Sequence, residues 1–220
     1  KYPGCVECLH NCNGESGGVR LVDYCTLSPD QQKVAVYFDQ SLEISTRFHI
    51  EPASICNSRC STCFIIHDDF TREVDLMDFD RVIESFGGDI KEATYIQLFY
   101  YGEPFLNPQT TRFLRYLSDN APKAKVVFST NGVYLKAEYA RDIIEVSRKV
   151  PIIVWNSLHG SRQENSRKYM GKTFMFDTAV ANFNYLSSLR TPDCNLRLVW
   201  KYVLFSWNDS VADLAELEHA

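Results

Sequence analysis

The sequence lacks a run of about 18 apolar residues, so it offers no segment of the length that a transmembrane helix needs. It also lacks a marked excess of positive charge: 23 Lys and Arg stand against 28 Asp and Glu, a net charge of −5 that argues against general nucleic-acid binding. No charged start followed by an apolar stretch and a small-residue cleavage site is visible. We therefore expect a cytoplasmic protein without an export signal.

The eight cysteines are too sparse among 220 residues for a disulfide scaffold, and they are grouped. Four lie within residues 1–25, three lie between residues 56 and 63, and Cys194 stands alone. In a chain without an export signal, such groups are typical of reduced thiolates that bind metal. The length corresponds to one full domain plus a piece, and we expect a Cys-rich extension over 1–46 and the main domain over 47–220.

From Arg47 onward, a short apolar strand followed by an amphipathic helix recurs about every 35 residues, the length of a strand–helix–strand repeat. We predict that Gly87 and Gly88 end the first helix and that Asn107 caps the second. Repeats of this kind form a parallel sheet, either in a barrel or in an open doubly wound fold. The predicted strands are 48–52, 95–100, 126–129, 151–157 and 196–205, with a further strand or hairpin over 33–44.

Residues suited to chemistry follow four of these strands at their carboxyl ends, where function is found in both architectures. They are Cys56, Cys60 and Cys63; Gly102-Glu103-Pro104; Ser129-Thr130-Asn131-Gly132; and Asn156-Ser157-Leu158-His159-Gly160. We expect all four segments to meet at one rim of the sheet.

The spacing Cys56-x3-Cys60-x2-Cys63 places three thiolates in an eight-residue loop. A four-iron cluster held by three cysteines keeps one iron without a protein ligand, which a substrate or cofactor can chelate. A structural zinc with a fourth ligand such as His67, and buried thiols unrelated to metal, are the alternatives that spacing leaves open.

Together these motifs resemble the radical S-adenosylmethionine (radical SAM) superfamily, in which a C-x3-C-x2-C loop follows the first strand of a partial (β/α) barrel. The strand-two and strand-three segments are similar to further motifs of that family, and the resemblance covers 47–220. Thr62 and Tyr101 depart from the pattern, since relatives often have an aromatic residue and a glycine there. The resemblance implies an α/β fold with parallel strands and outer helices, truncated after about the fifth unit.

The same resemblance implies roles for individual residues. Cys56, Cys60 and Cys63 would bind a [4Fe-4S] cluster, and Glu103, beside Gly102, would accept hydrogen bonds from the ammonium group of S-adenosylmethionine (SAM). Arg167 would pair with the SAM carboxylate, a role for which Lys168 competes. The other residues expected to contact the cofactor are Ser129, Asn131, Ser157 and Asn208. No residue is assigned a catalytic role.

The implied activity is reductive cleavage of SAM to a 5′-deoxyadenosyl radical that abstracts hydrogen from a substrate. The substrate would be a peptide, a protein or a small molecule, and the electron donor a protein such as flavodoxin or ferredoxin. The strand-two motif is similar to that of members with a C-terminal SPASM-type auxiliary-cluster domain. The alternative is a non-catalytic iron–sulfur or zinc module for electron transfer or assembly, which would need neither Glu103 nor an open iron site.

A second metal site is expected at Cys5, Cys8, Cys12 and Cys25, near His10. Structural zinc, an auxiliary iron–sulfur cluster and unligated thiols all remain open there. We interpret Cys194 as a small apolar residue and His159 as a structural rather than a substrate-facing side chain. Arg197 and Lys201 share one strand face, directed toward a polar cavity or toward solvent.

Overall fold

The computed structural model describes residues 46–66 and 71–217. The strand expected over 33–44, the Cys-rich extension and His67 lie outside the described residues. Within the described part, none of the helices combines the length and the apolar character that crossing a bilayer requires.

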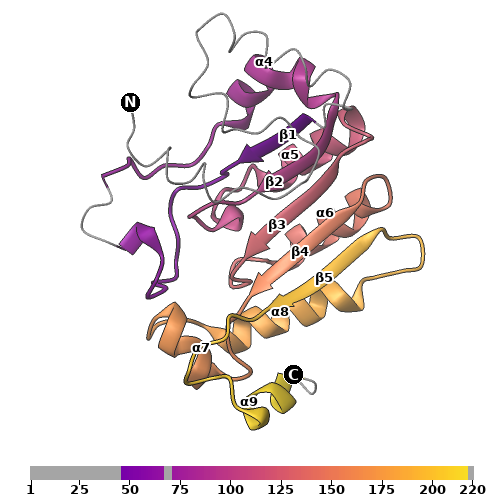
Figure 1. Cartoon of the computed structure of the whole chain (residues 1–220). Coiled ribbons are helices and arrows are strands. Elements are labelled where there is room, and N and C mark those ends of the chain that lie inside the picture. Colours follow the sequence, from indigo (N-terminus) through magenta and orange to yellow (C-terminus); the bar gives the residue numbers. More distant parts are fainter. Residues whose placement is uncertain (1–45, 67–70, 218–220) are drawn as a thin grey trace, which may run out of the picture. The chain divides into compact units, whose positions relative to one another are not determined.

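Five parallel strands form one sheet in the order β1-β2-β3-β4-β5, which is also their order along the chain (Figure 1). Each strand pairs in parallel with the next, and in the described part of the chain β1 and β5 are the two edges. The sheet is therefore an open segment of a barrel. The strands are β1 (Thr46–Ile50), β2 (Ala93–Leu98), β3 (Lys125–Thr130), β4 (Ile152–Ser157) and β5 (Leu196–Lys201).

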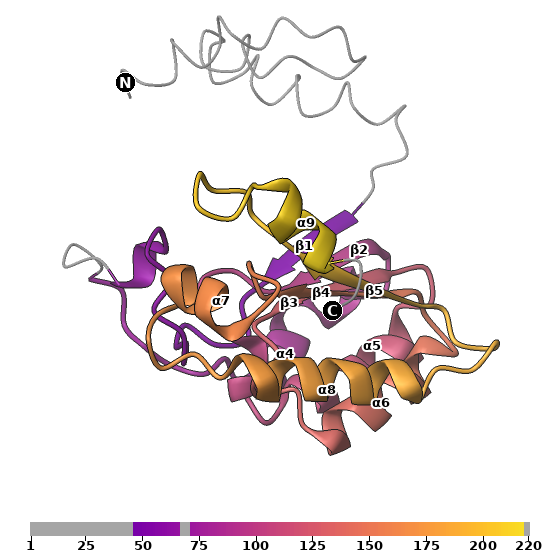
Figure 2. The same ribbon diagram turned by 90° about the horizontal axis from the view of Figure 1, so that it is seen from below.

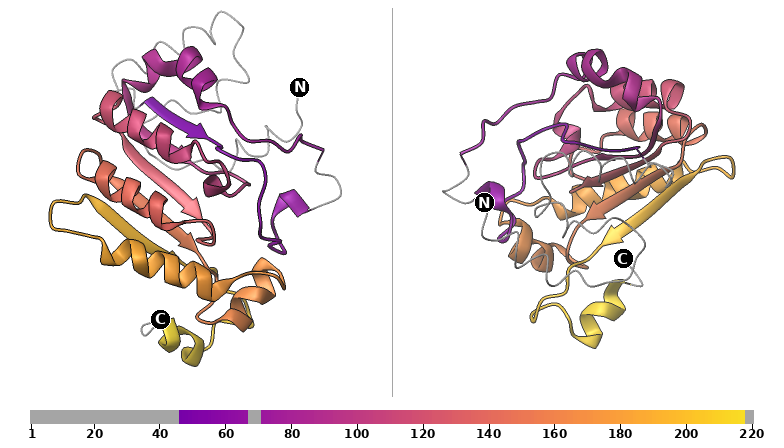
Figure 3. Two further views of the ribbon diagram at one scale, coloured as in Figure 1. Left: turned by 180° about the vertical axis from the view of Figure 1, so that it is seen from behind. Right: turned by 45° about the horizontal axis from the view of Figure 1, so that its top comes forward.

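The long connecting helices α4, α5, α6 and α8 cover one face of this sheet, as Figure 2 and Figure 3 show. Connections on one side, between strands in sequential order, are the arrangement of a (β/α) barrel, so the predicted partial barrel is confirmed. The helices are α4 (Phe79–Ile90), α5 (Thr110–Asn120), α6 (Ala137–Ser147), α7 (Gln163–Met170), α8 (Phe176–Ser188) and α9 (Val211–Leu217), with 3₁₀ turns η2 (Phe64–Ile66) and η3 (Pro104–Leu106).

The main core lies between the sheet and these helices. Alternate strand residues such as Ile96 and Val154 are fully buried toward the helices, where they meet Leu114, Leu117 and Ile143 of α5 and α6. Because side chains alternate along a strand, the intervening residues project from the opposite face. The packed core thus fixes the strand ends from which the candidate site residues extend.

Two local predictions were wrong. Helix α4 continues through Gly87 and Gly88 to Ile90 because Gly87 is buried where α4 packs near Tyr116, and Ile90 is itself part of the core. Helix α5 begins at Thr110 and not directly after Asn107. The N-cap position is Gln109, and Asn107 caps the turn before the helix, because its Oδ1 accepts the Gln109 N–H at 2.9 Å. The Asn107 amide also donates to two backbone carbonyls of neighbouring segments.

Candidate cofactor site

The three cysteines lie in the loop that follows β1, and all three are half-buried free thiols. The backbone of the same loop is fastened to the end of α7, because Arg59 N–H donates to the Met170 carbonyl at 2.9 Å and Ser61 N–H to the Tyr169 carbonyl at 2.8 Å. The loop is therefore positioned by a helix more than 100 residues later in the chain.

The environment of these thiols is not that of reactive nucleophiles. Burial, together with the nearby Glu103 carboxylate, raises the pKa of Cys56 to about 11. Burial and the two neighbouring cysteines raise the pKa of Cys60 to about 12. A nucleophilic cysteine has a lowered pKa, whereas a bound metal ion deprotonates a thiol outright.

Three thiolates in one loop are a donor set that suits an iron–sulfur cluster. A four-iron cluster takes one thiolate on each of three irons, so its ligands need not share a centre. The Ser58 hydroxyl is buried in the same loop without a hydrogen-bond partner and is available to a bound group. The three cysteines and Ser58 thus fit an iron–sulfur cluster.

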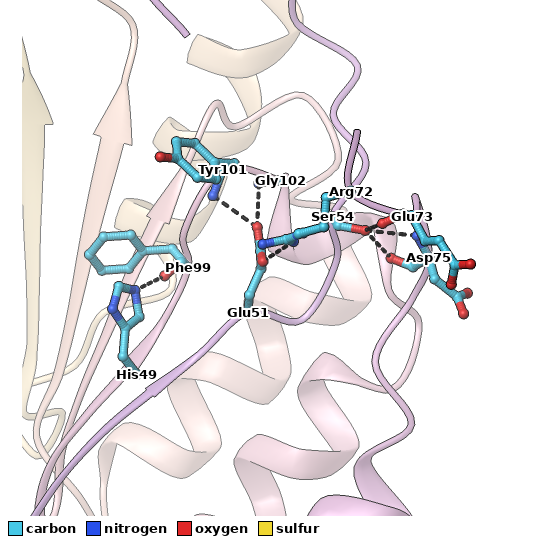
Figure 4. A network of polar contacts seen from close by, with 9 residues as sticks. All are labelled: His49, Glu51, Ser54, Arg72, Glu73, Asp75, Phe99, Tyr101 and Gly102. Carbon is cyan, nitrogen blue, oxygen red and sulfur yellow. Dashed lines mark hydrogen bonds and ion pairs between the residues drawn. The ribbon is translucent and has the colours of Figure 1, made fainter. Parts of the chain in front are cut away.

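The strand-two motif packs directly against the cysteine loop. A Cβ atom added to Gly102 would lie 1.7 Å from the Ala53 carbonyl oxygen, so only glycine fits there. Glu103 N–H donates to the Ile55 carbonyl at 2.8 Å. The backbone N–H groups of Tyr101 and Gly102 donate to Glu51, whose carboxylate also pairs with Arg72 (Figure 4).

Glu103 is the most deeply buried carboxylate of this region, with 2% of its surface exposed. It accepts hydrogen bonds from Thr130 Oγ1 at 2.6 Å, from Asn131 N–H at 2.8 Å and from Phe105 N–H at 3.2 Å, and it caps η3. Burial nonetheless raises the pKa of Glu103 to about 7. No described Lys or Arg pairs with this carboxylate, so an ammonium group bound beside it would offset the cost of burying its charge.

Asn131 links the carboxylate to the cysteine loop. Its backbone N–H binds Glu103, and its side-chain Nδ2 donates to Asn57 Oδ1 at 2.8 Å and lies 3.8 Å from Cys56 Sγ. The ends of β1, β2 and β3 therefore meet at one point, as expected from the strand order. The side-chain hydroxyls of Ser129 and Ser157 lie 3.2 Å apart on neighbouring strands.

Two further residues of the predicted set lie in other surroundings. Arg167 donates from Nε to the Phe174 carbonyl at 3.0 Å and lines a cavity of about 550 Å³ beside α7, with Lys168. Asn208 is fully buried, and its amide binds the backbone of residues 159, 203 and 205, which closes the turn after β5. Their roles toward SAM stay predictions.

His159 lies at the end of the β4 segment in the left-handed region, with φ 53°, and its ring packs edge-on against Tyr169 at 4.8 Å. The ring is 6% exposed and its Nδ1 atom has no hydrogen-bond partner in the structure. Burial and the Lys201 charge lower the pKa of His159 to about 4, so the ring is neutral at pH 7.

Three residues of the site were not predicted from the sequence. Thr130 lies within the strand-three motif, and its hydroxyl makes the shortest contact to Glu103. Glu51 organises the backbone before Glu103, and Ser58 carries the unpartnered hydroxyl in the cysteine loop. Glu51 could have been predicted, because it directly follows β1 at the edge where the other site residues lie. Nothing in the sequence distinguishes Ser58 from an ordinary loop serine.

Comparisons with solved structures identify the same architecture. SuiB of Streptococcus suis bound to S-adenosylmethionine matches with a TM-score of 0.59 and 17% identity, over 86% of this chain and 41% of SuiB. Native anSMEcpe with bound AdoMet and Cp18Cys peptide matches with a TM-score of 0.53 and 18% identity, over 70% of this chain and 42% of that one. TYW1 with a lysine-pyruvate adduct matches with a TM-score of 0.51 and 14% identity, over 79% of this chain and 61% of TYW1.

The chain thus spans less than two thirds of the length of these structures. No curated protein matches the sequence. Residues 50–206, well over half of the chain, match the profile described as Radical SAM superfamily. This stretch contains all three loop cysteines, Glu103 and Asn131, whose arrangement is described above. The chain therefore belongs to the radical SAM superfamily.

Proposed function

We propose that this chain carries the core of an enzyme that cleaves SAM reductively and directs the resulting radical to a substrate. The observation that supports this most strongly is Glu103, a buried carboxylate without a described cationic partner, joined through Asn131 to the loop of Cys56, Cys60 and Cys63. A bound cation is what this carboxylate lacks, and SAM carries one in its ammonium group.

When bound, a [4Fe-4S] cluster and SAM supply a one-electron cleavage that yields a 5′-deoxyadenosyl radical able to abstract hydrogen from an unactivated C–H bond. The protein residues bind and orient. Cys56, Cys60 and Cys63 would hold the cluster, and Glu103, ionised in the complex, would accept hydrogen bonds from the SAM ammonium. Ser129 and Ser157, with Asn131, offer further hydrogen-bonding groups at the strand ends.

We propose a peptide substrate, because two structures of similar fold contain one by their titles: SuiB bound to the precursor peptide SuiA, and anSMEcpe with the Cp18Cys peptide. We also propose a SPASM-type auxiliary-cluster domain. The reaction on the substrate would be either an oxidation or the modification of a group. We further propose an external electron donor of the flavodoxin or ferredoxin type, and a zinc or auxiliary iron–sulfur site at Cys5, Cys8, Cys12 and Cys25 in an extension over 1–46, ahead of a core over 47–220.

The alternative, a non-catalytic electron-transfer or assembly module, has less support. Such a module gains nothing from a buried carboxylate without a cation partner, which is unfavourable for stability unless a ligand compensates for it. It would also be expected to ligate its cluster fully with protein side chains. The described residues favour the enzyme on both counts: Glu103 is buried without a described cationic partner, and no fourth described His, Cys, Asp or Glu side chain joins Cys56, Cys60 and Cys63.

The test begins with anaerobic reconstitution of the protein with iron and sulfide. After reduction with dithionite, SAM is expected to change the electron paramagnetic resonance spectrum, and chromatography is expected to detect 5′-deoxyadenosine. Stoichiometric zinc uptake at Cys56, Cys60 and Cys63, without any spectral response to SAM, would refute the proposal.

The role of Glu103 is tested by calorimetric titration of the reconstituted Glu103→Gln variant with SAM. Loss of a hydrogen bond to a charged group, worth about 1.5–3 kcal/mol, should weaken SAM binding by about 10-fold to 100-fold while the iron content stays unchanged. Glu92→Gln is the control, since Glu92 is exposed and forms an ion pair with Lys123 at the surface. Equal SAM affinity in the two variants would remove Glu103 from the binding site.

A further inference from the structure

The face of the sheet opposite α4, α5, α6 and α8, here called the open face, carries an unusual set of charges. Helix α9 lies on this side of the sheet (Figure 2). None of the five strands contains an Asp or Glu residue. Residues paired in register on neighbouring parallel strands project from the same face. Arg47 and Lys125 are both in register with Tyr95, and Arg197 is in register with Ile153, so these three cations lie on the open face. Lys201, in register with Ser157, is a fourth cation at the carboxyl end of β5.

The carboxylates described beside this surface have partners. Glu216 of α9, on the same side of the sheet, binds Ser161 and Arg162 (Figure 2). The nearest carboxylate to follow a strand on this face, Glu51, is committed to Arg72 and to two backbone N–H groups (Figure 4). Lys125, Arg197 and Lys201 are exposed and form no ion pair with any residue that the structure describes. The face is thus locally basic on a chain whose net charge is −5.

Aromatic rings occupy the middle of the open face. Phe99 and Trp155 approach to 5.5 Å between ring centroids, with the small Ser129 on the intervening strand. The Lys201 ammonium lies 5.7 Å from the centroid of the Trp155 ring. His49 packs edge-on against Phe99 on the other side (Figure 4). An apolar strip therefore crosses the sheet and ends at a cation.

This strip adjoins the candidate cofactor site. Lys201 is in register with Ser157, whose hydroxyl contacts Ser129. Trp155 is in register with Ser129 itself, two residues before Asn131 of the site. A molecule resting on Trp155 and Lys201 would therefore lie beside the carboxyl ends of β3 and β4, where the radical of the proposed function would form.

We infer that the open face binds an acidic segment of the peptide substrate, with Lys201 and Arg197 contacting its carboxylates and Trp155 packing against an apolar side chain. The inference rests on the proposed function, because it assigns the substrate of the same site. Lys201 and Arg197 lie on the same face four residues apart, about 13 Å along β5, a span that two carboxylates of an extended peptide can match.

The net charge of the chain and the local charge of the open face have opposite signs. A protein of net charge −5 attracts basic peptides and repels acidic ones if only its average field acts. Preference for an acidic peptide would therefore have to arise from a local basic surface, where complementary charges give specificity. If the average charge of the chain decides, basic peptides bind more tightly than acidic ones. If the local charge of the open face decides, acidic peptides bind more tightly.

The experiment measures binding of labelled peptides of equal length and apolar content by fluorescence anisotropy, at low and at raised salt. Their charged positions are all Glu, all Gln or all Lys. The full-length protein is expected to bind the Glu peptide about tenfold more tightly than the Lys peptide, with a preference that falls as salt rises. The doubly substituted Arg197→Glu/Lys201→Glu protein should reverse this preference.

The matched control is Lys91→Glu/Arg190→Glu, which changes the net charge equally at two exposed positions at the other end of the sheet. It should leave the ranking of the peptides unchanged. Trp155→Ala should weaken binding of all three peptides several-fold without changing their order, since it removes apolar contact and no charge. Folding of each variant is checked by its far-ultraviolet circular dichroism and its iron content.

Tighter binding of the Lys peptide by the unmodified protein, or an equal effect of the control substitutions, would overturn the inference. Formation of 5′-deoxyadenosine by the unmodified protein without peptide is measured in parallel. If that reaction occurs while acidic peptides show no preference, the inference fails and the proposed function stands. If it does not occur with a cluster in place, the proposed function fails whatever the peptides do.

Discussion

Gly102→Ala is expected to separate the strand-two motif from the cysteine loop. The added Cβ would lie 1.7 Å from the Ala53 carbonyl oxygen, 2.6 Å from its carbon and 2.8 Å from the Ile55 carbonyl oxygen. All three are backbone atoms, so no side-chain rotation can relieve the overlap. Overpacking of this kind costs typically about 1–3 kcal/mol and sometimes more, and we expect at least 3 kcal/mol here because the backbone itself must move.

A loss of about 3 kcal/mol corresponds to a fall in melting temperature of about 6–12 °C for a domain of this size. Gly88→Ala is the control, because an added Cβ at Gly88 meets nothing within 4 Å and the residue lies inside α4. It should stabilise the protein by up to about 1 kcal/mol. Both variants are compared by urea and thermal unfolding and by iron uptake on reconstitution.

The expected pattern is lower stability and lower iron content for Gly102→Ala, with both values unchanged or improved for Gly88→Ala. The displaced segment includes the Glu103 N–H that binds the Ile55 carbonyl, next to Cys56. Unfolding and iron uptake equal to those of the unmodified protein would show that the two segments do not touch as described, and would refute the reasoning.

Three further results are expected. The pKa of His159 is about 4, so as pH falls the unfolded chain is protonated at this residue before the folded chain. Between pH 7.5 and 5 the unmodified protein should therefore lose about 2 kcal/mol of unfolding free energy that His159→Asn does not lose, as measured by urea titration. Equal losses in the two proteins would contradict the buried position of His159. Asn107→Ala removes the hydrogen bonds to the Pro52 and Met77 carbonyls and the acceptor of the Gln109 N–H, and should reduce the unfolding free energy by about 2–4 kcal/mol; a loss below 1 kcal/mol would argue against these bonds. Leu117→Ala, at a fully buried position of α5, should destabilise by about 2–5 kcal/mol in the same assay, and a near-neutral effect would place Leu117 outside the core.

The sequence was sufficient to predict the sheet and its strand ends, because each repeat shows the buried strand and the amphipathic helix directly. It misplaced the end of α4, since whether Gly87 breaks a helix or admits a neighbour depends on Tyr116, a tertiary contact that no local pattern contains. It missed α7 for a similar reason. That helix is short and mostly polar, and its buried residues include Asn165 and Ser166.

The candidate site was predictable to the extent that it depends on strand ends. Topology alone brings Glu103 and Asn131 beside the cysteine loop, and the structure confirms that meeting. The choice of hydrogen-bond partners was not predictable, because Thr130 and Ser58 are recognised only by distances in the folded chain. Asn208 illustrates the same limit, since its amide is committed to backbone groups that lie together only after folding.

The two edges of the sheet have a consequence for how this part of the chain behaves in solution. Within the described residues, β1 pairs only with β2 and β5 only with β4, so each outer edge presents backbone groups that can accept another strand. Arg47 on β1, with Arg197 and Lys201 on β5, gives both edges the same sign of charge. These like charges oppose the pairing of one such edge with another. Because salt screens exposed charges, that opposition falls as ionic strength rises.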